Sequence, residues 1–312
     1  MPSSTVKFVY VSSPFSTHGI FLQLPRKLLI CYLLSVNTHP IKLICIDVDN
    51  TLVDNRKDIP EPNRKAIRWA HFEKGAHIAV NSGRIGPSTR DYMERLGVQD
   101  AYPSLNGCIV QDWDGSIIEE SFIEKEVALK INGIAKELGC TMFVYHHDIW
   151  YLDPGNDYWA ESEFMATNLR GTIIDTDNHI RSQAPNKMLG VQADPVLTTM
   201  LKERIEKLFP MYVDCFKSDP RFLEIMPKGV NKGTAVEALC RHYGIGRDNV
   251  MAIGDYYNDM AMFNASGISV AMANAPEDIK TQVTYVTDAD NIHCGVAEAI
   301  YRFMVTASCK SL

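Results

Sequence analysis

The stretch Leu43-Ile-Cys-Ile-Asp-Val-Asp-Asn-Thr-Leu-Val-Asp54 decides the fold of this 312-residue chain. Its first four residues are apolar, and they run directly into Asp47 and Asp49. A short continuous apolar run of this kind is typical of a strand buried on both faces, as in a parallel sheet. The two carboxylates then lie at the carboxyl end of the strand, where open α/β sheets place their ligands. Two carboxylates two residues apart, beside the Thr51 hydroxyl, can bind a hard cation and leave one oxygen free to attack.

The composition is that of an ordinary globular protein, with 46% apolar and 22% charged residues. The net charge is −7 and no lysine/arginine run is present. We therefore expect no nucleic acid and no membrane as partner, whereas a small anionic substrate is compatible with a locally cationic site. The eight cysteines form no Cys-x-x-Cys pair, which predicts reduced thiols in a cytoplasmic protein. The chain is compatible with a monomer or a small homo-oligomer.

Residues 1–40 do not match the rest of the chain. Two apolar patches are interrupted by Pro25, Arg26 and Lys27, and neither patch is long enough to span a bilayer. The basic residues lie inside the apolar region instead of ahead of it, which argues against a signal peptide. We interpret this segment as an N-terminal extension to which the sequence assigns no role, and we expect its removal to leave activity intact.

From Ile41 onward, strands and helices alternate. Residues 63–74 form a predicted helix after Pro60 and Pro62, residues 77–80 a second buried strand, residues 87–96 a helix, and residues 102–110 a third strand region. Asp114-Gly115 marks a hairpin. This order with short links predicts a doubly wound parallel sheet.

The middle of the chain has a different pattern. Residues 121–221 combine helices with hairpin-linked strands, which predicts an α+β unit with an antiparallel sheet. The alternation resumes after Arg221, where Asn231 can cap a helix and a strand over residues 250–253 ends at Gly254-Asp255. We therefore expect a discontinuous α/β core of residues 41–120 and 222–312, interrupted by an α+β insert of residues 121–221.

Four short motifs fall at strand ends or at a helix start: Asp47-x-Asp49-x-Thr51, Asn81-Ser82-Gly83-Arg84, Gly229-Val-Asn-Lys232-Gly-Thr234, and Gly254-Asp255-Tyr-Tyr-Asn258-Asp259. In this order they resemble the four motifs of the haloacid dehalogenase (HAD) superfamily of phosphotransferases. Ser269-Val-Ala-Met-Ala-Asn-Ala275 and Cys294-Gly-Val296 extend the resemblance to the Cof-like subfamily, which hydrolyses small organophosphates. The resemblance runs from about Ile41 to the end of the chain.

The resemblance implies a Rossmann-like HAD core and a cap domain, residues 121–221, that covers the site and selects the substrate. It implies a Mg²⁺-dependent phosphatase in which Asp47 is the nucleophile and forms an aspartyl-phosphate. Asp49 would be the general acid and base. Lys232 would be the positive charge that stabilises the phosphate. Sugar phosphates are the leading substrate class on this basis.

Magnesium prefers oxygen ligands in octahedral geometry. The resemblance and the motif chemistry suggest Asp47, Asp255 and the backbone carbonyl of Asp49 as metal ligands, with Asp259 orienting Asp255. For phosphate and substrate contacts we expect Thr51, Ser82, Gly83, Asn106, Gly107 and Asn258.

Several points stay open at this level. Asn50 stands where the family has glycine, and asparagine is the residue that next best tolerates positive φ. Arg84 can contact either the substrate or a core carboxylate. The His146-His147-Asp148 turn fits ordinary hairpin surface better than substrate contact.

Two rival functions are compatible with the motifs. One is a phosphomutase that uses the same aspartyl-phosphate, and the other is a non-catalytic sensor of a phosphate ligand. Each motif residue taken alone also has a structural explanation, such as a helix cap or a turn. The joint presence of Asp47, Asp49, Lys232 and Asp255 argues against a sensor, which does not need both a nucleophile and an acid/base.

Overall fold

A computed structural model of the chain describes residues 9–11, 20–22 and 39–305. The predicted N-terminal extension therefore lies almost wholly outside the described residues. Within it, β1 (Val9–Val11) pairs antiparallel with β2 (Ile20–Leu22). Within these described ranges, no helix has the length and apolarity needed to cross a membrane.

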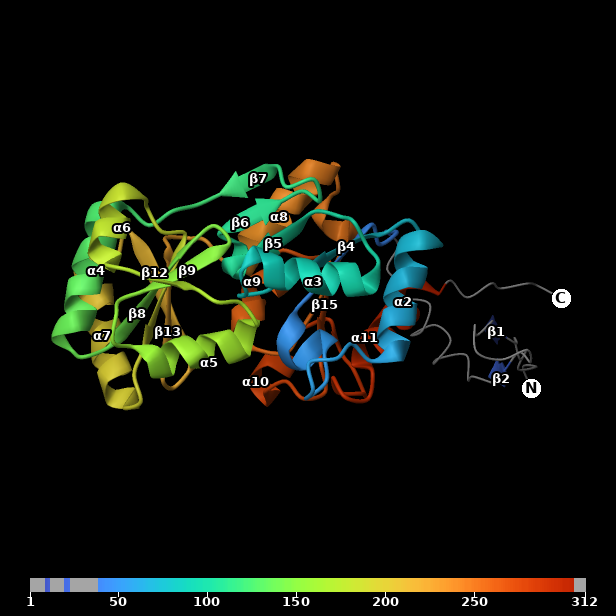
Figure 1. The fold of residues 1–312 in the computed structure, drawn as a ribbon. Helices are drawn as coiled ribbons and strands as arrows, with labels where there is room; N and C mark the ends of the chain where they lie inside the picture. The colour runs from blue at the N-terminus through green and yellow to red at the C-terminus, as the bar shows by residue number, and fades with distance from the viewer. Residues whose placement is uncertain (1–8, 12–19, 23–38, 306–312) are drawn as a thin grey trace.

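Five parallel strands form the sheet that carries the candidate site, and β15 and β4 of this sheet are labelled in Figure 1. Their order from edge to edge is β16 (Tyr285–Val286), β15 (Ile268–Ala271), β14 (Val250–Gly254), β3 (Leu43–Ile46) and β4 (His77–Val80). All four pairings are parallel, which confirms the predicted doubly wound sheet. β3 lies between β14 and β4, and the register places Ile46 beside Ile253 and Val80.

Helices cover both faces of this sheet. One face is covered by α2 (Glu61–Phe72), α3 (Gly86–Leu96) and α11 (Gly295–Met304). The other face is covered by α8 (Lys232–Tyr243), α9 (Met260–Asn264) and α10 (Glu277–Lys280). Side chains alternate along β3, so Ile44 and Ile46 pack into the first layer while Leu43 and Cys45 pack into the second. Because both faces are buried, the whole strand is apolar, which explains the unbroken run in the sequence.

A separate antiparallel sheet contains β5 (Tyr102–Ser104), β6 (Ile109–Gln111) and β7 (Ile117–Glu120). The sequence predicted one strand region over residues 102–110, but the chain reverses at Leu105–Gly107, where all three residues have positive φ. β6 therefore returns antiparallel along β5. The hairpin predicted at Asp114-Gly115 is confirmed by the antiparallel pairing of β6 with β7.

The second large sheet has six strands and is mostly antiparallel. Its order is β10 (Thr172–Ile173), β9 (Ile149–Leu152), β8 (Thr141–His146), β11 (Lys187–Val191), β13 (Phe222–Pro227) and β12 (Val213–Asp219). Only β10 and β9 pair in parallel. Three helices pack on one face: α4 (Lys125–Glu137), α6 (Thr176–Ser182) and α7 (Pro195–Leu208). This is the α+β mixture predicted for the middle of the chain.

One boundary differs from the prediction. Residues 222–227 were expected to begin the second core segment, but as β13 they pair with β11 and β12 in the six-stranded sheet. β12 and β13 form a hairpin around Pro220 and Arg221, so both strands belong to one sheet, and the pairing of β13 with β11 makes this the six-stranded sheet.

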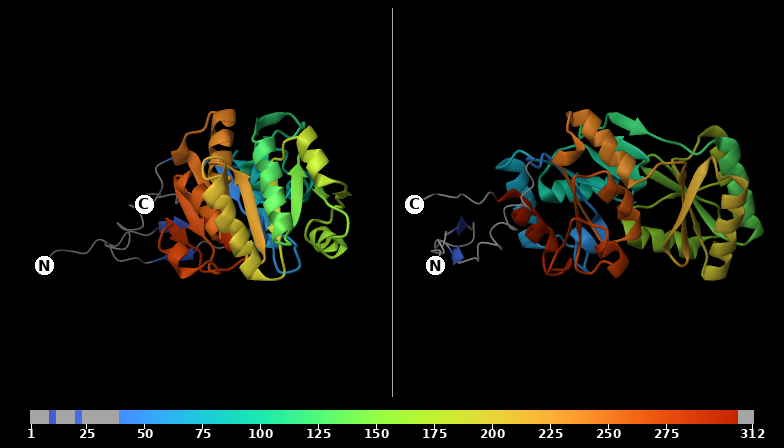
Figure 2. Two further views of the ribbon diagram at one scale, coloured as in Figure 1. Left: turned by 90° about the vertical axis from the view of Figure 1, so that its left-hand side faces the viewer. Right: turned by 180° about the vertical axis from the view of Figure 1, so that it is seen from behind.

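The other face of the six-stranded sheet packs toward the parallel-sheet region, and the two regions lie side by side (Figures 1 and 2). Phe143 and Leu189 from this face share a hydrophobic cluster with Ile85 and Leu105. Trp159 and Ala160 of α5 (Asp157–Thr167) pack against the same cluster. The contact between the two regions is therefore partly apolar.

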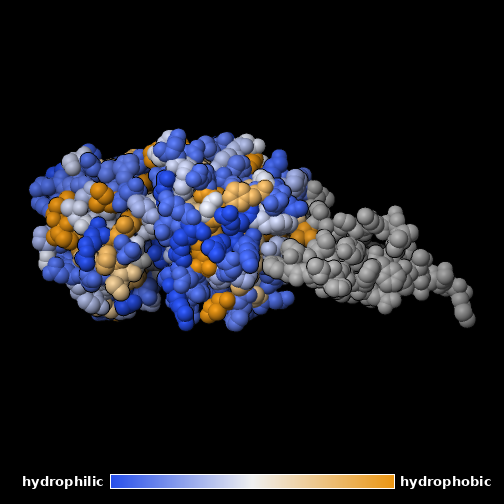
Figure 3. Space-filling model, turned by 45° about the vertical axis from the view of Figure 1, so that its right-hand side comes forward, coloured by the Kyte–Doolittle hydropathy of each residue, from blue (hydrophilic) through white to orange (hydrophobic). Residues whose placement is uncertain are grey.

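Polar contacts also join the two regions. The hydroxyl of Ser88 donates to the carbonyl oxygen of Thr167 at 3.0 Å. The ammonium of Lys187 donates to the carbonyl oxygen of Gly83 at 3.2 Å. On the outer surface drawn in Figure 3, hydrophilic residues predominate and apolar residues form small separate patches, the normal distribution for a globular protein.

Candidate active site

The carboxyl ends of three neighbouring strands bring three motifs to one edge of the parallel sheet. Asp47 directly follows β3, Ser82 lies two residues beyond β4, and Asp255 directly follows β14. Parallel strands end on the same edge, so these side chains converge as the sequence predicted.

Lys232 is the first residue of α8, and the start of the helix fixes its position. The predicted cap is present, because the Asn231 side chain accepts hydrogen bonds from the N–H groups of Gly233 and Thr234 at 2.9 and 3.3 Å. A Cβ at Gly233 would lie 2.5 Å from the carbonyl oxygen of Ala261. Only glycine therefore lets the helix start approach α9 this closely.

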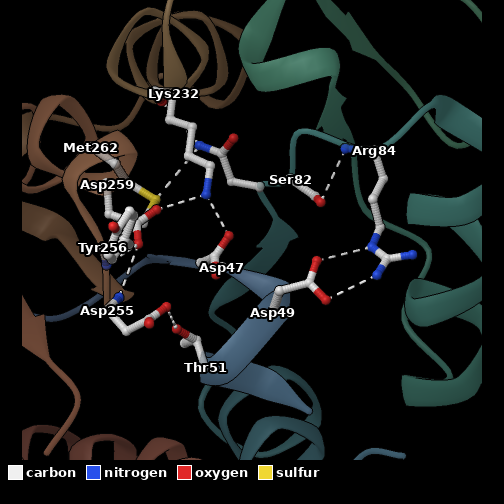
Figure 4. A network of polar contacts seen from close by, with 11 residues as sticks. Asp47, Asp49, Thr51, Ser82, Arg84, Lys232, Asp255, Tyr256, Asp259 and Met262 are labelled. Atoms are coloured by element: carbon white, nitrogen blue, oxygen red, sulfur yellow. Dashed lines mark hydrogen bonds and ion pairs between the residues drawn. The ribbon is translucent and has the colours of Figure 1, made fainter. Parts of the chain in front are cut away.

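The ammonium of Lys232 joins Asp47 to Asp259 (Figure 4). It donates to Oδ1 of Asp47 and, at 2.6 Å, to Oδ1 of Asp259. The lysine side chain is 1% exposed. Burial by itself lowers the pKa of Lys232, but the charges of Asp259 and Asp47 raise it above the ordinary value. The site therefore holds a permanent buried cation against one oxygen of Asp47.

Asp259 orients its neighbours. Its Oδ2 accepts hydrogen bonds from the backbone N–H groups of Asp255 at 2.9 Å and Tyr256 at 3.1 Å. A Cβ at Gly254 would lie 2.5 Å from the same oxygen, so glycine is required for the close approach. Both oxygens of this fully buried carboxylate are thus engaged, one by Lys232 and one by the backbone.

Asp255 is held by a threonine. Its Oδ1 accepts a hydrogen bond from the Thr51 hydroxyl at 3.0 Å. Burial, and to a smaller extent the negative charge of Asp259, raises the pKa of Asp255 to about 7. Thr51 is fully buried and is not among the residues that line the cavity described below. Its hydroxyl therefore lies behind Asp255, in contrast to the expected contact with phosphate.

Carboxylate oxygens of Asp47, Asp255 and Asp259 lie within 4.8 Å of one another. Burial raises the pKa of Asp47 well above its ordinary value, and repulsion by Asp259 and Asp255 adds to this effect while Lys232 opposes it. When all three carboxylates are ionised they share one lysine charge, which leaves two negative charges in excess. A cluster of carboxylate oxygens with this excess negative charge fits a hard divalent cation. Because both oxygens of Asp259 are engaged, Asp47 and Asp255 are the better candidates for ligands.

Asp49 points toward Arg84 (Figure 4). Nε and Nη2 of Arg84 donate to its two oxygens at 3.1 and 2.9 Å, and Nζ of Lys57 lies 2.6 Å from Oδ1. Burial by itself raises the pKa of Asp49, but the hydrogen bonds and charges of Arg84 and Lys57 lower it to about 2. Arg84 thus pairs with a core carboxylate, and it also lines the cavity described below.

The backbone at Asn50 has φ = 60°. This confirms that the position where the family has glycine needs a left-handed conformation, which asparagine tolerates. Nδ2 of Asn274, from the C-terminal part of the motif resemblance, donates to the carbonyl oxygen of Asn50 at 2.9 Å. The turn after β3 is thereby tied to the segment after β15.

Two loops meet beside Ser82. The backbone N–H of Asn106 donates to the carbonyl oxygen of Ser82 at 2.9 Å, and a Cβ at Gly83 would lie 3.0 Å from the Asn106 side chain. Oδ1 of Asn106 is buried without a hydrogen-bond partner in the described structure. Gly107 does not line the cavity, and a Cβ there would lie 2.5 Å from the carbonyl oxygen of Asn231. Its evident contribution is close packing of the two loops, not the expected substrate contact.

A cavity of about 610 Å³ extends from the strand ends to the six-stranded sheet. What we call its inner end is lined by Asp47, Ser82, Lys232 and Asp255. What we call its outer end is lined by Tyr145, Glu163, Lys187, Leu189, Phe216, Phe222 and Glu224. Of the predicted site residues, Asp49, Gly83, Asn106 and Asn258 also line the cavity, whereas Thr51, Gly107 and Asp259 do not.

Four polar residues of the outer end were not singled out from the sequence: Tyr145, Glu163, Lys187 and Glu224. For two of these residues, the sequence itself contains a sign of a buried partner or a function. Lys187 begins an otherwise apolar strand, and Glu224 interrupts another. A charged residue inside an apolar strand needs a buried partner or a function.

The His146-His147-Asp148 turn does not line the cavity. Nδ1 of His146 lies 3.0 Å from the carbonyl oxygen of Ala184, and Nδ1 of His147 lies 3.4 Å from Glu120. The preferred interpretation of these histidines as hairpin surface agrees with these contacts.

Comparison with known proteins places these observations in context. A family model described as haloacid dehalogenase-like hydrolase matches residues 44–300. The chain is 27% identical over 265 residues to a 5-amino-6-(5-phospho-D-ribitylamino)uracil phosphatase of Bacillus subtilis, covering 85% of this chain and 96% of the relative.

Solved structures give the same result. A haloacid dehalogenase-like hydrolase of Bacteroides thetaiotaomicron matches with a TM-score of 0.76 at 28% identity, covering 84% of this chain and 99% of the other. A protein of Plasmodium vivax described as HAD/COF-like matches with a TM-score of 0.77 at 25% identity, covering 87% of this chain and 98% of the other. The family resemblance found in the four motifs thus extends over the whole fold.

Proposed function

The chain belongs to the haloacid dehalogenase-like hydrolases, and from this premise we propose that it is a Mg²⁺-dependent phosphatase of small organic phosphate esters, with sugar phosphates as its substrate class. The observation that carries the proposal is the buried contact of Asp47 with Lys232 beside Asp255, at the inner end of the cavity. A carboxylate held against a fixed cation suits attack on a phosphoryl group, whose charge needs neutralising.

In the proposed mechanism an oxygen of Asp47 attacks phosphorus and forms an aspartyl-phosphate, while the bond from phosphorus to the ester oxygen breaks. Asp49 gives a proton to the departing oxygen and then takes one from the water that hydrolyses the intermediate. Lys232 and the Ser82 hydroxyl hold phosphoryl oxygens. A Mg²⁺ ion held by Asp47, Asp255 and the backbone carbonyl of Asp49 would supply the positive charge that the carboxylate cluster lacks.

The acid/base role sets a condition on Asp49. A carboxyl group whose pKa is lowered to about 2 by Arg84 and Lys57 is a poor proton donor near neutral pH. The proposal therefore requires Asp49 to leave Arg84 and turn toward the ester oxygen when substrate binds.

We propose that residues 41–120 and 228–312 form the catalytic core and that residues 121–227 form the cap, which includes β13 because this strand belongs to the six-stranded sheet. The cavity supports this division, because its two ends are lined by the two parts of the chain.

All six cysteines in the described residues are unpaired, which supports a reducing compartment such as the cytoplasm.

Two points support the proposed substrate class: the size of the cavity and the substrate named for a relative. A cavity of about 610 Å³ accepts a leaving group as well as a phosphate. The Bacillus subtilis relative is named for a phosphorylated ribitylamino compound, an ester of a sugar-derived chain. Both points support sugar or polyol phosphates for this protein.

The test is phosphate release from a panel of sugar phosphates, nucleotides and cofactor phosphates, with Mg²⁺ or with EDTA. We expect release only with metal, and none from Asp47→Asn. Asp58→Asn is the matched control, since its carboxylate is 72% exposed. Absence of release from every ester by folded protein with metal would reject the phosphatase and favour a mutase or a sensor. Transfer to a second hydroxyl that depends on a bisphosphate would identify the mutase.

A further inference from the structure

The outer end of the cavity contains a buried ion pair. Nζ of Lys187 lies 2.5 Å from Oε2 of Glu224, and these side chains are 4% and 10% exposed. Oε1 of Glu224 accepts a hydrogen bond from the Ser218 hydroxyl at 2.9 Å. Lys187 also donates to the carbonyl oxygen of Gly83. Its charge is therefore used by the protein itself.

The second lysine of the six-stranded sheet at this cavity is also engaged. Nζ of Lys217 donates to the Thr199 hydroxyl at 2.6 Å and to the carbonyl oxygens of Pro195 and Pro220 at 3.2 and 3.3 Å. These partners belong to the start of α7 and to the β12–β13 turn. The stem of Lys217 lines the cavity while its charge is held at the edge of the sheet.

Glu163 has no such partner. Its Oε1 accepts a hydrogen bond from the Tyr145 hydroxyl at 3.0 Å, and it forms no ion pair with any residue that the structure describes. Burial raises the pKa of Glu163, while Lys187 and the tyrosine hydroxyl partly offset this effect. Tyr145 lies between the two charged groups, since Nζ of Lys187 is 5.0 Å from the centre of its ring.

The outer end is thus lined by two carboxylates, Glu163 and Glu224, and by the ammonium of Lys187, and the cavity lining also includes Lys217 and Arg84. The remaining lining includes the apolar side chains Leu189, Phe216 and Phe222. A leaving group with a carboxylate or a second phosphate would face these two carboxylates. It would find Lys187 and Lys217 held by groups of the protein and Arg84 paired with Asp49. Hydroxyl and ammonium groups are hydrogen-bond donors, and the apolar walls suit the C–H faces of a sugar or polyol.

We infer that Glu163, oriented by Tyr145, is a specificity-determining residue that favours phosphate esters whose leaving group carries hydroxyl or amino groups and disfavours those with a second anionic group. This inference rests on the proposed function, because it assumes that the phosphoryl group binds at the inner end. It narrows the substrate class to neutral or cationic sugar and polyol monophosphates.

The test compares kcat/KM within two matched substrate pairs. Glucosamine 6-phosphate differs from glucose 6-phosphate by an amino group, and 6-phosphogluconate differs from sorbitol 6-phosphate by a carboxylate. We expect the wild type to prefer the amino sugar and to disfavour the carboxylate, each by about tenfold. In Glu163→Gln both ratios should move toward one by at least about threefold.

The ratios are taken within each variant, so a general loss of activity cancels. Glu161→Gln is the matched control, because this neighbour on α5 is exposed and pairs with Arg170 at 3.6 Å, and both ratios should stay at wild-type values. Tyr145→Phe removes the hydrogen bond to Glu163 and should shift both ratios in the same direction by less. It replaces Glu163→Gln if that variant does not fold.

Acetyl phosphate separates the two proposals, since its small leaving group does not require the outer end. If the wild type hydrolyses acetyl phosphate through Asp47 but Glu163→Gln leaves both ratios unchanged, the inference about Glu163 is overturned and the phosphatase stands. If no ester, including acetyl phosphate, is hydrolysed in an Asp47-dependent manner, both proposals are rejected.

Discussion

Arg84 donates hydrogen bonds to both carboxylate oxygens of Asp49, although the two residues lie 35 positions apart in the chain. A bidentate pair of this kind fixes the orientation as well as the charge of the carboxylate. The pair also keeps Asp49, the residue proposed to transfer the proton, in its ionised form before substrate binds.

The first prediction concerns this pair and pH. The pKa of Asp49 is lowered, so the pair stabilises the folded protein above the ordinary aspartate pKa of about 4, and this stabilisation is lost as pH falls toward 2. The Asp49 side chain is 41% exposed, and solvent screening reduces the effect to about 1 kcal/mol. Arg84→Gln should lower the free energy of unfolding in urea by this amount at pH 7, and by less at pH 3. The control Arg64→Gln breaks an exposed pair and should differ little at either pH. If Arg84→Gln lowers the free energy of unfolding by the same amount at both pH values, the lowered pKa of Asp49 is contradicted.

The second prediction concerns the buried cation. Lys232→Met leaves Asp47 and Asp259 without their common partner, so kcat/KM should fall at least about 100-fold. The free energy of unfolding should fall by about 3 kcal/mol, because buried carboxylates remain unpaired. Lys228→Met removes an exposed lysine four residues earlier and should be nearly neutral. Activity near the wild-type level in folded Lys232→Met would rule out its role at the phosphate.

The third prediction concerns metal binding without turnover. If Asp47 and Asp255 hold Mg²⁺, adding the ion should raise the thermal midpoint of the wild type, and Asp255→Asn should remove most of that rise. The pKa of Asp255 is about 7, so its carboxyl group is mostly protonated below that pH and must lose the proton to bind metal. Affinity measured by calorimetry should therefore weaken as pH is lowered from 8 to 6. An affinity independent of pH over this range would argue against Asp255 as a ligand.

The fourth prediction concerns Gly254. A methyl group there would push on Asp259, which positions both Lys232 and the backbone of Asp255. Gly254→Ala should lower kcat/KM at least about tenfold and the free energy of unfolding by about 1–3 kcal/mol. At Gly246 the nearest atom would be 3.7 Å from the new Cβ, so Gly246→Ala is the control and should be mild. Equal behaviour of the two variants would show that the contact with Asp259 is unimportant.

Much of the fold could be predicted because its signals are local. The apolar run before Asp47 reflects burial of β3 on both faces, and Asn231 marks the start of α8 through its own side-chain cap. Asp47, Ser82 and Asp255 converge because each follows a strand of one parallel sheet, so these three motifs could be grouped from their positions at predicted strand ends.

The rest depends on contacts between distant parts of the chain. The reversal at Leu105–Gly107 rests on three consecutive positive φ angles, which no periodicity reports. The pairing of β13 with β11 decides which sheet residues 222–227 join. The partners of Thr51 and Lys187 lie 204 and 37 residues away, so their roles could not be read from neighbouring residues.

The six-stranded sheet and its helices begin after β7 ends at Glu120 and finish where β13 ends at Pro227, and α8 starts with Lys232. Asp47, Lys232 and Asp255 all lie outside this interval, whereas Glu163 lies within it. If the proposed roles of these residues are correct, substrate preference and bond-breaking chemistry are encoded in separate lengths of the gene. Exchange of the segment between these two junctions with that of a relative should then change the substrate preference and leave the bond-breaking chemistry in place.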